Sequence, residues 1–135
     1  METVSATFRR NRLLAQASPD ELRLLEPHLE PVTLPLRLDL ETLDTRIEHA
    51  YFMNDGIASV AVVQRNKTRI EVGLVGCEGM TGTAIVLGDD LSQFATYMQV
   101  TGHGLRIAAD ALRSAMKASS SLSAMLLKYV HVFHV

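Results

Sequence analysis

The chain has 135 residues, of which 47% are apolar and 21% are charged. This balance is typical of a globular protein and excludes a disordered one. The net charge of −2 argues against a domain that binds nucleic acid itself, because such domains carry a basic surface. The one cysteine, Cys77, excludes a disulfide framework and a cysteine-rich metal site.

Residues 1–12 are polar and show no signal-peptide pattern. No apolar stretch approaches the ~20 residues needed to span a membrane. We therefore expect one cytoplasmic domain over residues 1–135, with no membrane contact.

Two short helices are expected between residues 11 and 30. Asn11 is a suitable N-cap for the first. The sequence Ser-Pro-Asp-Glu at 18–21 predicts the start of the second, because Ser18 can cap, Pro19 fits the first helical position and Glu21 completes a capping box. Pro27 should end that helix early.

From Val32 the apolar residues recur with a period of two, which predicts strands as far as residue 108. Pro35 marks the first as an edge strand. The sequence Asn-Asp-Gly at 54–56 predicts a hairpin between strands at 50–53 and 57–63. A second polar turn at 65–67 leads to a strand at 68–75. Strands at 94–101 and 105–108 should be joined by a turn at Gly102–Gly104. Short strands with tight turns predict an antiparallel barrel, roll or sandwich.

Five of the eight glycines lie between residues 71 and 95. A strand should end near Val75, and a short apolar segment from Met80 should stop at Gly88. A strand, a glycine-rich turn and a helix N-terminus together expose backbone N–H groups that can hold an anion. The alternative is a tight corner in a β-fold, which composition alone favours.

The pattern becomes helical again after residue 108. A helix is expected over Ala109–Lys117, and the serines at 119–121 can cap a final helix. Its apolar stripe at helical spacing consists of Leu122, Met125, Leu126, Tyr129, Val130 and Phe133. The chain stops without a C-cap residue, so we expect this helix to have been cut off.

The segment VGLVGCEGMTGTAIVLG at 72–88, with HAYFMNDGIASVAVV at 49–63, resembles the effector domain of bacterial Crp/Fnr transcription regulators. The similarity runs from about Asn11 to the last residue. It implies the cyclic-nucleotide-binding fold, an α+β but mainly β structure. An antiparallel β-roll or jelly-roll would occupy 31–108, flanked by helices at 11–30 and 109–135.

The resemblance also implies a partner. In that family the last helix begins the long helix through which two subunits form a homodimer. On this interpretation Leu122, Met125 and Leu126 touch the roll, whereas Tyr129, Val130 and Phe133 contact the partner helix. DNA would be bound through a helix-turn-helix that is absent from this chain.

Nucleotide-binding members carry a Gly-Glu-Leu whose glutamate holds the ribose, and an Arg-Ser/Thr-Ala whose arginine pairs with the cyclic phosphate. The matching positions here are Gly82-Thr83-Ala84 and Gln93-Phe94-Ala95. Thr83 and Gln93 replace the two charged residues, which removes the charge-assisted bonds. We expect these six residues to form a degenerate ligand-binding cassette that binds cyclic AMP and cyclic GMP poorly or not at all.

Other chemistry has little support in the sequence. Cys77 alone cannot ligate an iron–sulfur cluster, and a haem held by Cys77 or a histidine is less usual than a buried, inert cysteine. His131 and His134 have ligand-like spacing, but a solvated helix face explains them. No catalytic motif is present.

We therefore expect no cofactor, no metal and no catalytic residue, and a regulatory rather than an enzymatic role. The sequence also allows an unknown small-molecule effector. The alternative is a stand-alone module of the same fold that binds a small ligand or another protein.

Overall fold

The computed structural model describes residues 10–133. Short helical elements come first: η2 (Leu14–Gln16), α2 (Pro19–Leu25) and η3 (Glu26–His28). Strands follow, namely β1 (Glu30–Leu34), β2 (Asp39–Glu41), β3 (His49–Met53), β4 (Ile57–Val63) and β5 (Arg69–Val75). After α3 (Thr83–Val86) come β6 (Ala95–Val100) and β7 (Gly102–Ala108), and the last elements are α4 (Ala109–Ala118) and α5 (Ser120–Phe133).

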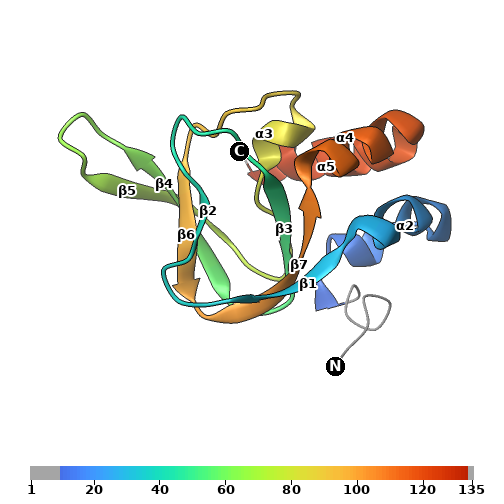
Figure 1. Ribbon diagram of the computed structural model, residues 1–135, viewed down its shortest axis with the longest axis horizontal. Coiled ribbons are helices and arrows are strands. Elements are labelled where there is room, and N and C mark those ends of the chain that lie inside the picture. The colour runs from blue at the N-terminus through green and yellow to red at the C-terminus, as the bar shows by residue number, and fades with distance from the viewer. Residues whose placement is uncertain (1–9, 134–135) are drawn as a thin grey trace.

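The strands form two antiparallel sheets, with the orders β1-β7-β3 and β2-β6-β4-β5. Figure 1 shows α2, α4 and α5 gathered beside the three-stranded sheet, while the β4–β5 hairpin projects on the opposite side. The predicted antiparallel roll with flanking helices is confirmed. The predicted edge strand before Pro35 is β1, which pairs with β7 alone.

The hairpin predicted between β3 and β4 is wrong. The turn exists, and Gly56 has the positive φ of 84° that the Asp-Gly pair favours. However, β3 pairs with β7 and β4 pairs with β5 and β6, so the turn carries the chain from one sheet to the other. The N–H groups of Asn54 and Asp55 donate to the carbonyl oxygen of His103, at 2.9 and 3.2 Å. These bonds tie the turn to β7.

The glycines at 102 and 104 also lie in a strand, not in the predicted turn. Both belong to β7, and the chain changes sheets between β6 and β7 at Thr101. Gly102 lies directly under the Asn54–Gly56 turn, where an added Cβ would contact the carbonyl oxygen of Asp55 and the Cα of Gly56. The close crossing of two backbones explains this glycine.

The core has two parts. The larger lies between the three-stranded sheet and the helices, and its fully buried members include Phe52, Leu105, Ile107, Leu112, Leu122 and Leu126. The smaller fills the roll and includes Leu34, Met53, Val60, Val75 and Met98. The capping box at Ser18 and Glu21 is present as predicted. Glu21 also accepts a bond from Ser121 at 2.7 Å, which joins α2 to α5.

We expect Gly102→Ala to lower the free energy of unfolding by about 1–3 kcal/mol, because the methyl group would collide with backbone that cannot rotate away. Gly76→Ala is the matched control, since the added Cβ would meet the flexible end of Glu78, with Oε2 at 2.9 Å. Urea unfolding of both variants measures the difference. Equal losses for the two variants would contradict the backbone crossing.

Candidate functional site

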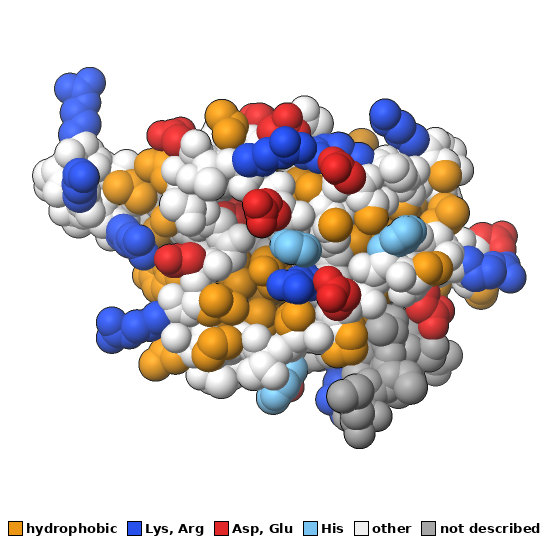
Figure 2. Space-filling view, viewed as in Figure 1, with side chains coloured by type: hydrophobic (Ala, Val, Ile, Leu, Met, Phe, Trp, Pro, Cys, Tyr) orange, Lys and Arg blue, Asp and Glu red, His pale blue; other side chains and the backbone are white. Residues whose placement is uncertain are grey.

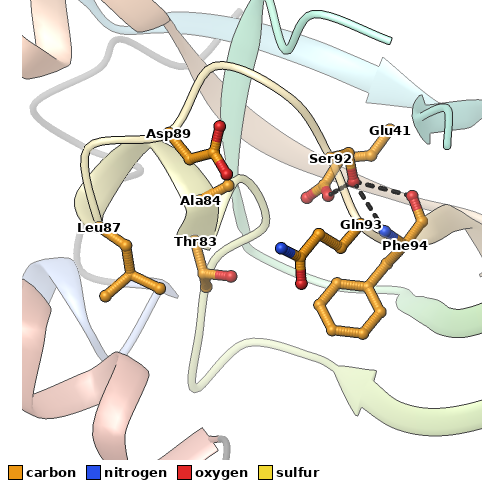
Figure 3. Close-up of a pocket in the computed structure, with 8 residues that line it drawn as sticks. All are labelled: Glu41, Thr83, Ala84, Leu87, Asp89, Ser92, Gln93 and Phe94. Carbon is orange, nitrogen blue, oxygen red and sulfur yellow. Dashed lines mark hydrogen bonds between the residues drawn. The ribbon is translucent and has the colours of Figure 1, made fainter. Parts of the chain in front are cut away.

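A cavity of about 330 Å³ opens between α3, the segment that follows it and β2. Its lining residues are Glu41, Thr83, Ala84, Leu87, Asp89, Ser92, Gln93 and Phe94. Figure 3 shows the carboxylate of Glu41 beside Ser92 on one side and the Phe94 ring at the edge. The volume is that of a small-molecule site, at the lower end of the usual range.

Glu41 on β2 is the central polar group of the cavity wall. It is only 9% exposed. Its Oε1 accepts the backbone N–H of Gly82 at 2.5 Å, and its Oε2 accepts the hydroxyl of Ser92 at 2.8 Å. The loop before α3 and the segment before β6 are therefore both tied to β2 through one carboxylate.

Burial raises the pKa of Glu41 above its usual value, and the bonds from Ser92 and Gly82 offset part of that rise. The Thr96 side chain lies close to Glu41 and, like these bonds, lowers the pKa of Glu41. Its Oγ1 is nevertheless buried without a hydrogen-bond partner of ordinary geometry. Thr96 is therefore a close neighbour of Glu41 without an ordinary hydrogen bond to it.

The structure brings most of the predicted cassette together. Four predicted residues line the cavity: Thr83, Ala84, Gln93 and Phe94. Gly82, with φ 76°, contributes its N–H to Glu41. Ala95 is the exception, because it starts β6 as a 6% exposed residue and does not belong to the lining. That these residues bind a ligand stays a prediction.

Sequence reasoning missed Glu41, Leu87 and Ser92. The burial of Glu41 could not be predicted because strand β2 is irregular. In a regular strand Asp39 and Glu41 would share a face and Leu40 would point the other way. A register shift between Asp39 and Glu41 instead leaves both Leu40 and Glu41 buried. Such a bulge has no signal in the apolar pattern.

Neither Arg69 on β5 nor Arg106 on β7 lines the cavity. Arg69 lies over the ring of Tyr97, 5.1 Å from its centroid, in a separate hollow. Arg106 pairs with Glu30 at 3.1 Å. The lining therefore contains two carboxylates and no arginine or lysine.

The last helix ends beside the cavity. A space of about 10 Å³ adjoins it and shares Glu41, Thr83 and Phe94 with the main lining, and Thr96 and Phe133 also contact that space. Phe133 stacks on Tyr129, with ring centroids 5.9 Å apart. Helix α5 is thus in direct contact with the wall of the candidate site.

The predicted partner residues lie against their own chain. Val130 is 4% exposed in the larger core. The Tyr129 hydroxyl donates to the carbonyl oxygen of Met80 at 3.4 Å, and burial raises the pKa of Tyr129 to about 12. Contact of these residues with a partner stays a prediction. The exposed apolar side chains of α5 are Leu127 and Val132, at 44% and 65%.

Several other expectations concern absences. Within residues 10–133 no three His, Cys, Asp or Glu side chains gather as a metal site, and His134 lies outside the described residues. Cys77 is a half-buried free thiol. No helix in that range combines the length and the apolar character needed to cross a membrane. On the face in Figure 2, Lys and Arg side chains are scattered among acidic ones.

No protein-family model matches the chain, and no curated protein matches it. Solved structures do resemble it. The N-terminal domain of a transcriptional regulator from Streptomyces coelicolor A3(2) has a TM-score of 0.68 and 16% identity, over 93% of this chain and 87% of that one. The sensor domain of the transcriptional regulator DNR from Pseudomonas aeruginosa has a TM-score of 0.71 and 13% identity, over 89% and 81%.

A third structure is the regulatory subunit of a cAMP-independent protein kinase A from Trypanosoma brucei. It has a TM-score of 0.74 and 11% identity, over 90% of this chain and 43% of that one. At such identities the similarity establishes the fold. The chain has the cyclic-nucleotide-binding fold, as its resemblance to Crp/Fnr effector domains predicted.

We expect Glu41→Gln to change how stability depends on pH. Because burial raises the pKa of Glu41, its neutral form stabilises the fold below the unfolded-state pKa, and this contribution is lost as the pH rises through the folded-state pKa. Glutamine removes that loss. The free energy of unfolding of the variant, relative to that of the wild type, should therefore rise with pH. The rise should be about 1.4 kcal/mol for each unit by which the pKa of Glu41 in the folded state exceeds that in the unfolded state.

Urea unfolding of the wild type and the variant across the range from about pH 4 to pH 8 measures this relative stability. Asp39→Asn is the control, because Asp39 is an exposed carboxylate on the same strand. A difference between wild type and Glu41→Gln that stays constant with pH would contradict a buried, proton-linked Glu41.

Proposed function

We propose that the chain is the effector-sensing and dimerisation domain of a bacterial, cytoplasmic Crp/Fnr-like transcription regulator. In this proposal its effector is a small molecule other than cyclic AMP or cyclic GMP. DNA would be bound by a helix-turn-helix outside this chain. The observation that carries the proposal is the Glu41 carboxylate, which faces the cavity and accepts the Gly82 N–H at 2.5 Å.

An anionic phosphate is poorly suited to this cavity. Gln93 supplies neutral donors where an arginine would supply a charged fork. An ionised Glu41 at about 4 Å from a phosphate charge would repel it by about 4 kcal/mol at an effective dielectric constant near 20. A protein of this fold can also belong to a system that does not depend on cAMP, since the Trypanosoma brucei regulatory subunit belongs to a cAMP-independent protein kinase A.

The route from the cavity to the rest of a regulator runs through α5. Phe94 lines the main cavity and also contacts the small space that Phe133 lines. An effector that moves Phe94 would change the packing of Phe133 and therefore the position of the last helix. A ligand that prefers one of two helix positions shifts the population between them.

We expect cyclic AMP and cyclic GMP to bind with a Kd weaker than about 1 mM, which corresponds to about −4.1 kcal/mol. Isothermal titration calorimetry of the purified chain measures this. The physical reason is the pair of carboxylates at Glu41 and Asp89 together with the absence of arginine from the lining. Micromolar binding of either nucleotide would contradict the proposed effector class.

We expect the chain to form a homodimer through α5 and to retain or bind a non-nucleotide small molecule. Native mass spectrometry reports subunit number and bound ligand together. The double variant Leu127→Glu, Val132→Glu should be a monomer with an unchanged circular dichroism spectrum, because both side chains are exposed on α5. Ser114→Glu, at an exposed position on α4, is the control and should leave the dimer intact. A wild-type monomer would contradict dimerisation by this helix.

A further inference from the structure

We infer that the cavity receives a small organic cation, namely an ammonium group attached to an apolar group. The ammonium would lie at the Glu41 and Asp89 side, and the apolar part would lie against Leu87 and Phe94. The inference rests on the proposed function, because it assumes that this cavity is the effector site.

The charges of the lining point to a cation. Two of the eight lining residues are carboxylates, Glu41 and Asp89, and none is basic. The nearby Asp90 is paired with Arg113 at 2.6 Å. Within the described chain, no ion pair joins an arginine or lysine to Glu41 or Asp89. Asp89 is exposed, but Glu41 is only 9% exposed, and a buried carboxylate normally has a positive partner, which a ligand can supply.

The second observation is a buried hydroxyl group beside the cavity. Thr96 is 1% exposed, and its Oγ1, which lies near Glu41, makes no hydrogen bond of ordinary geometry. It contacts the space of about 10 Å³ that shares Glu41, Thr83 and Phe94 with the cavity. Nearly all buried hydroxyls are paired, and this space is large enough for about one water molecule. An N–H donor in the cavity, acting through one water in this space, would give the Thr96 hydroxyl a partner next to Glu41.

The third observation is the apolar side of the cavity. Leu87 is 60% exposed at its mouth, and Ala84 and Phe94 continue the apolar wall. Figure 3 shows the Phe94 ring at the edge of the cavity and the Asp89 carboxyl group on the α3 side. An apolar group seated there would remove Leu87 from water, and an aromatic ring beside an ammonium adds a cation–π attraction.

The test is a set of three probes that share a phenyl group and differ in charge: 2-phenylethylammonium, 2-phenylethanol and phenylacetate. Calorimetric titration of the full chain should give binding of the ammonium compound at least about tenfold tighter than the alcohol, with no detectable binding of phenylacetate. The ammonium should also protect α5 from hydrogen exchange, because Phe133 adjoins the site.

Asp89→Asn should reduce the preference for the ammonium over the alcohol several-fold. Asp89 is exposed, and asparagine can keep its bond from the Leu91 N–H, so this variant should fold. Glu41→Gln should reduce the preference further. Asp39→Asn is the matched control, because Asp39 does not line the cavity, and it should leave the preference unchanged.

Three results would overturn the inference: no binding of the ammonium probe, equal binding of the alcohol, or a preference that survives both cavity substitutions. Tighter binding of the alcohol would contradict the inference of a cationic effector but would remain consistent with the proposed small-molecule sensor. Micromolar cyclic-nucleotide binding would instead remove the proposed function itself.

Discussion

One buried carboxylate sets the character of this domain. Glu41 accepts bonds from Gly82 and Ser92, which are 41 and 51 residues away in sequence. A buried acid is costly unless its oxygens are hydrogen-bonded, so these bonds and the fold depend on one another. They hold together β2, the loop before α3 and the segment before β6. The same group that fixes the cavity wall also places a carboxyl group in the lining.

The glycine-rich stretch serves this arrangement as a corner of the fold. Its Gly82 N–H, which could have held an external anion, is already bonded to Glu41. Two other glycines seat the last helix, because a Cβ at Gly79 would contact the Tyr129 hydroxyl and one at Gly73 would lie 3.1 Å from the Phe133 ring. The corner therefore joins the cavity to α5, and larger side chains there would push the helix away.

Local signals in the sequence were sufficient where one segment decides its own structure. The capping box at Ser18, the edge strand before Pro35 and the start of α5 behind Ser119 depend on neighbours within a few residues. The Asn54–Gly56 turn was predictable for the same reason. Its strand partners were not, because a turn does not specify which of two sheets its strands join. The burial of Glu41 was not predicted, because a bulge between Asp39 and Glu41 changes the face of the strand on which Glu41 lies.

Aligned cassette positions indicate where a ligand would lie, but the charge of the lining determines which ligand is stable there. In the alignment that the resemblance predicts, Gln93 takes the place of a phosphate-binding arginine and its positive charge, and the lining holds the carboxyl groups of Glu41 and Asp89. The backbone can stay that of a cyclic-nucleotide-binding domain while the electrostatic preference reverses. Phe94 and Phe133 line one small space, and close-packed groups cannot move independently. In the proposed function, the connection to α5 therefore does not depend on the ligand's charge, and the fold could keep its output while its effector changes.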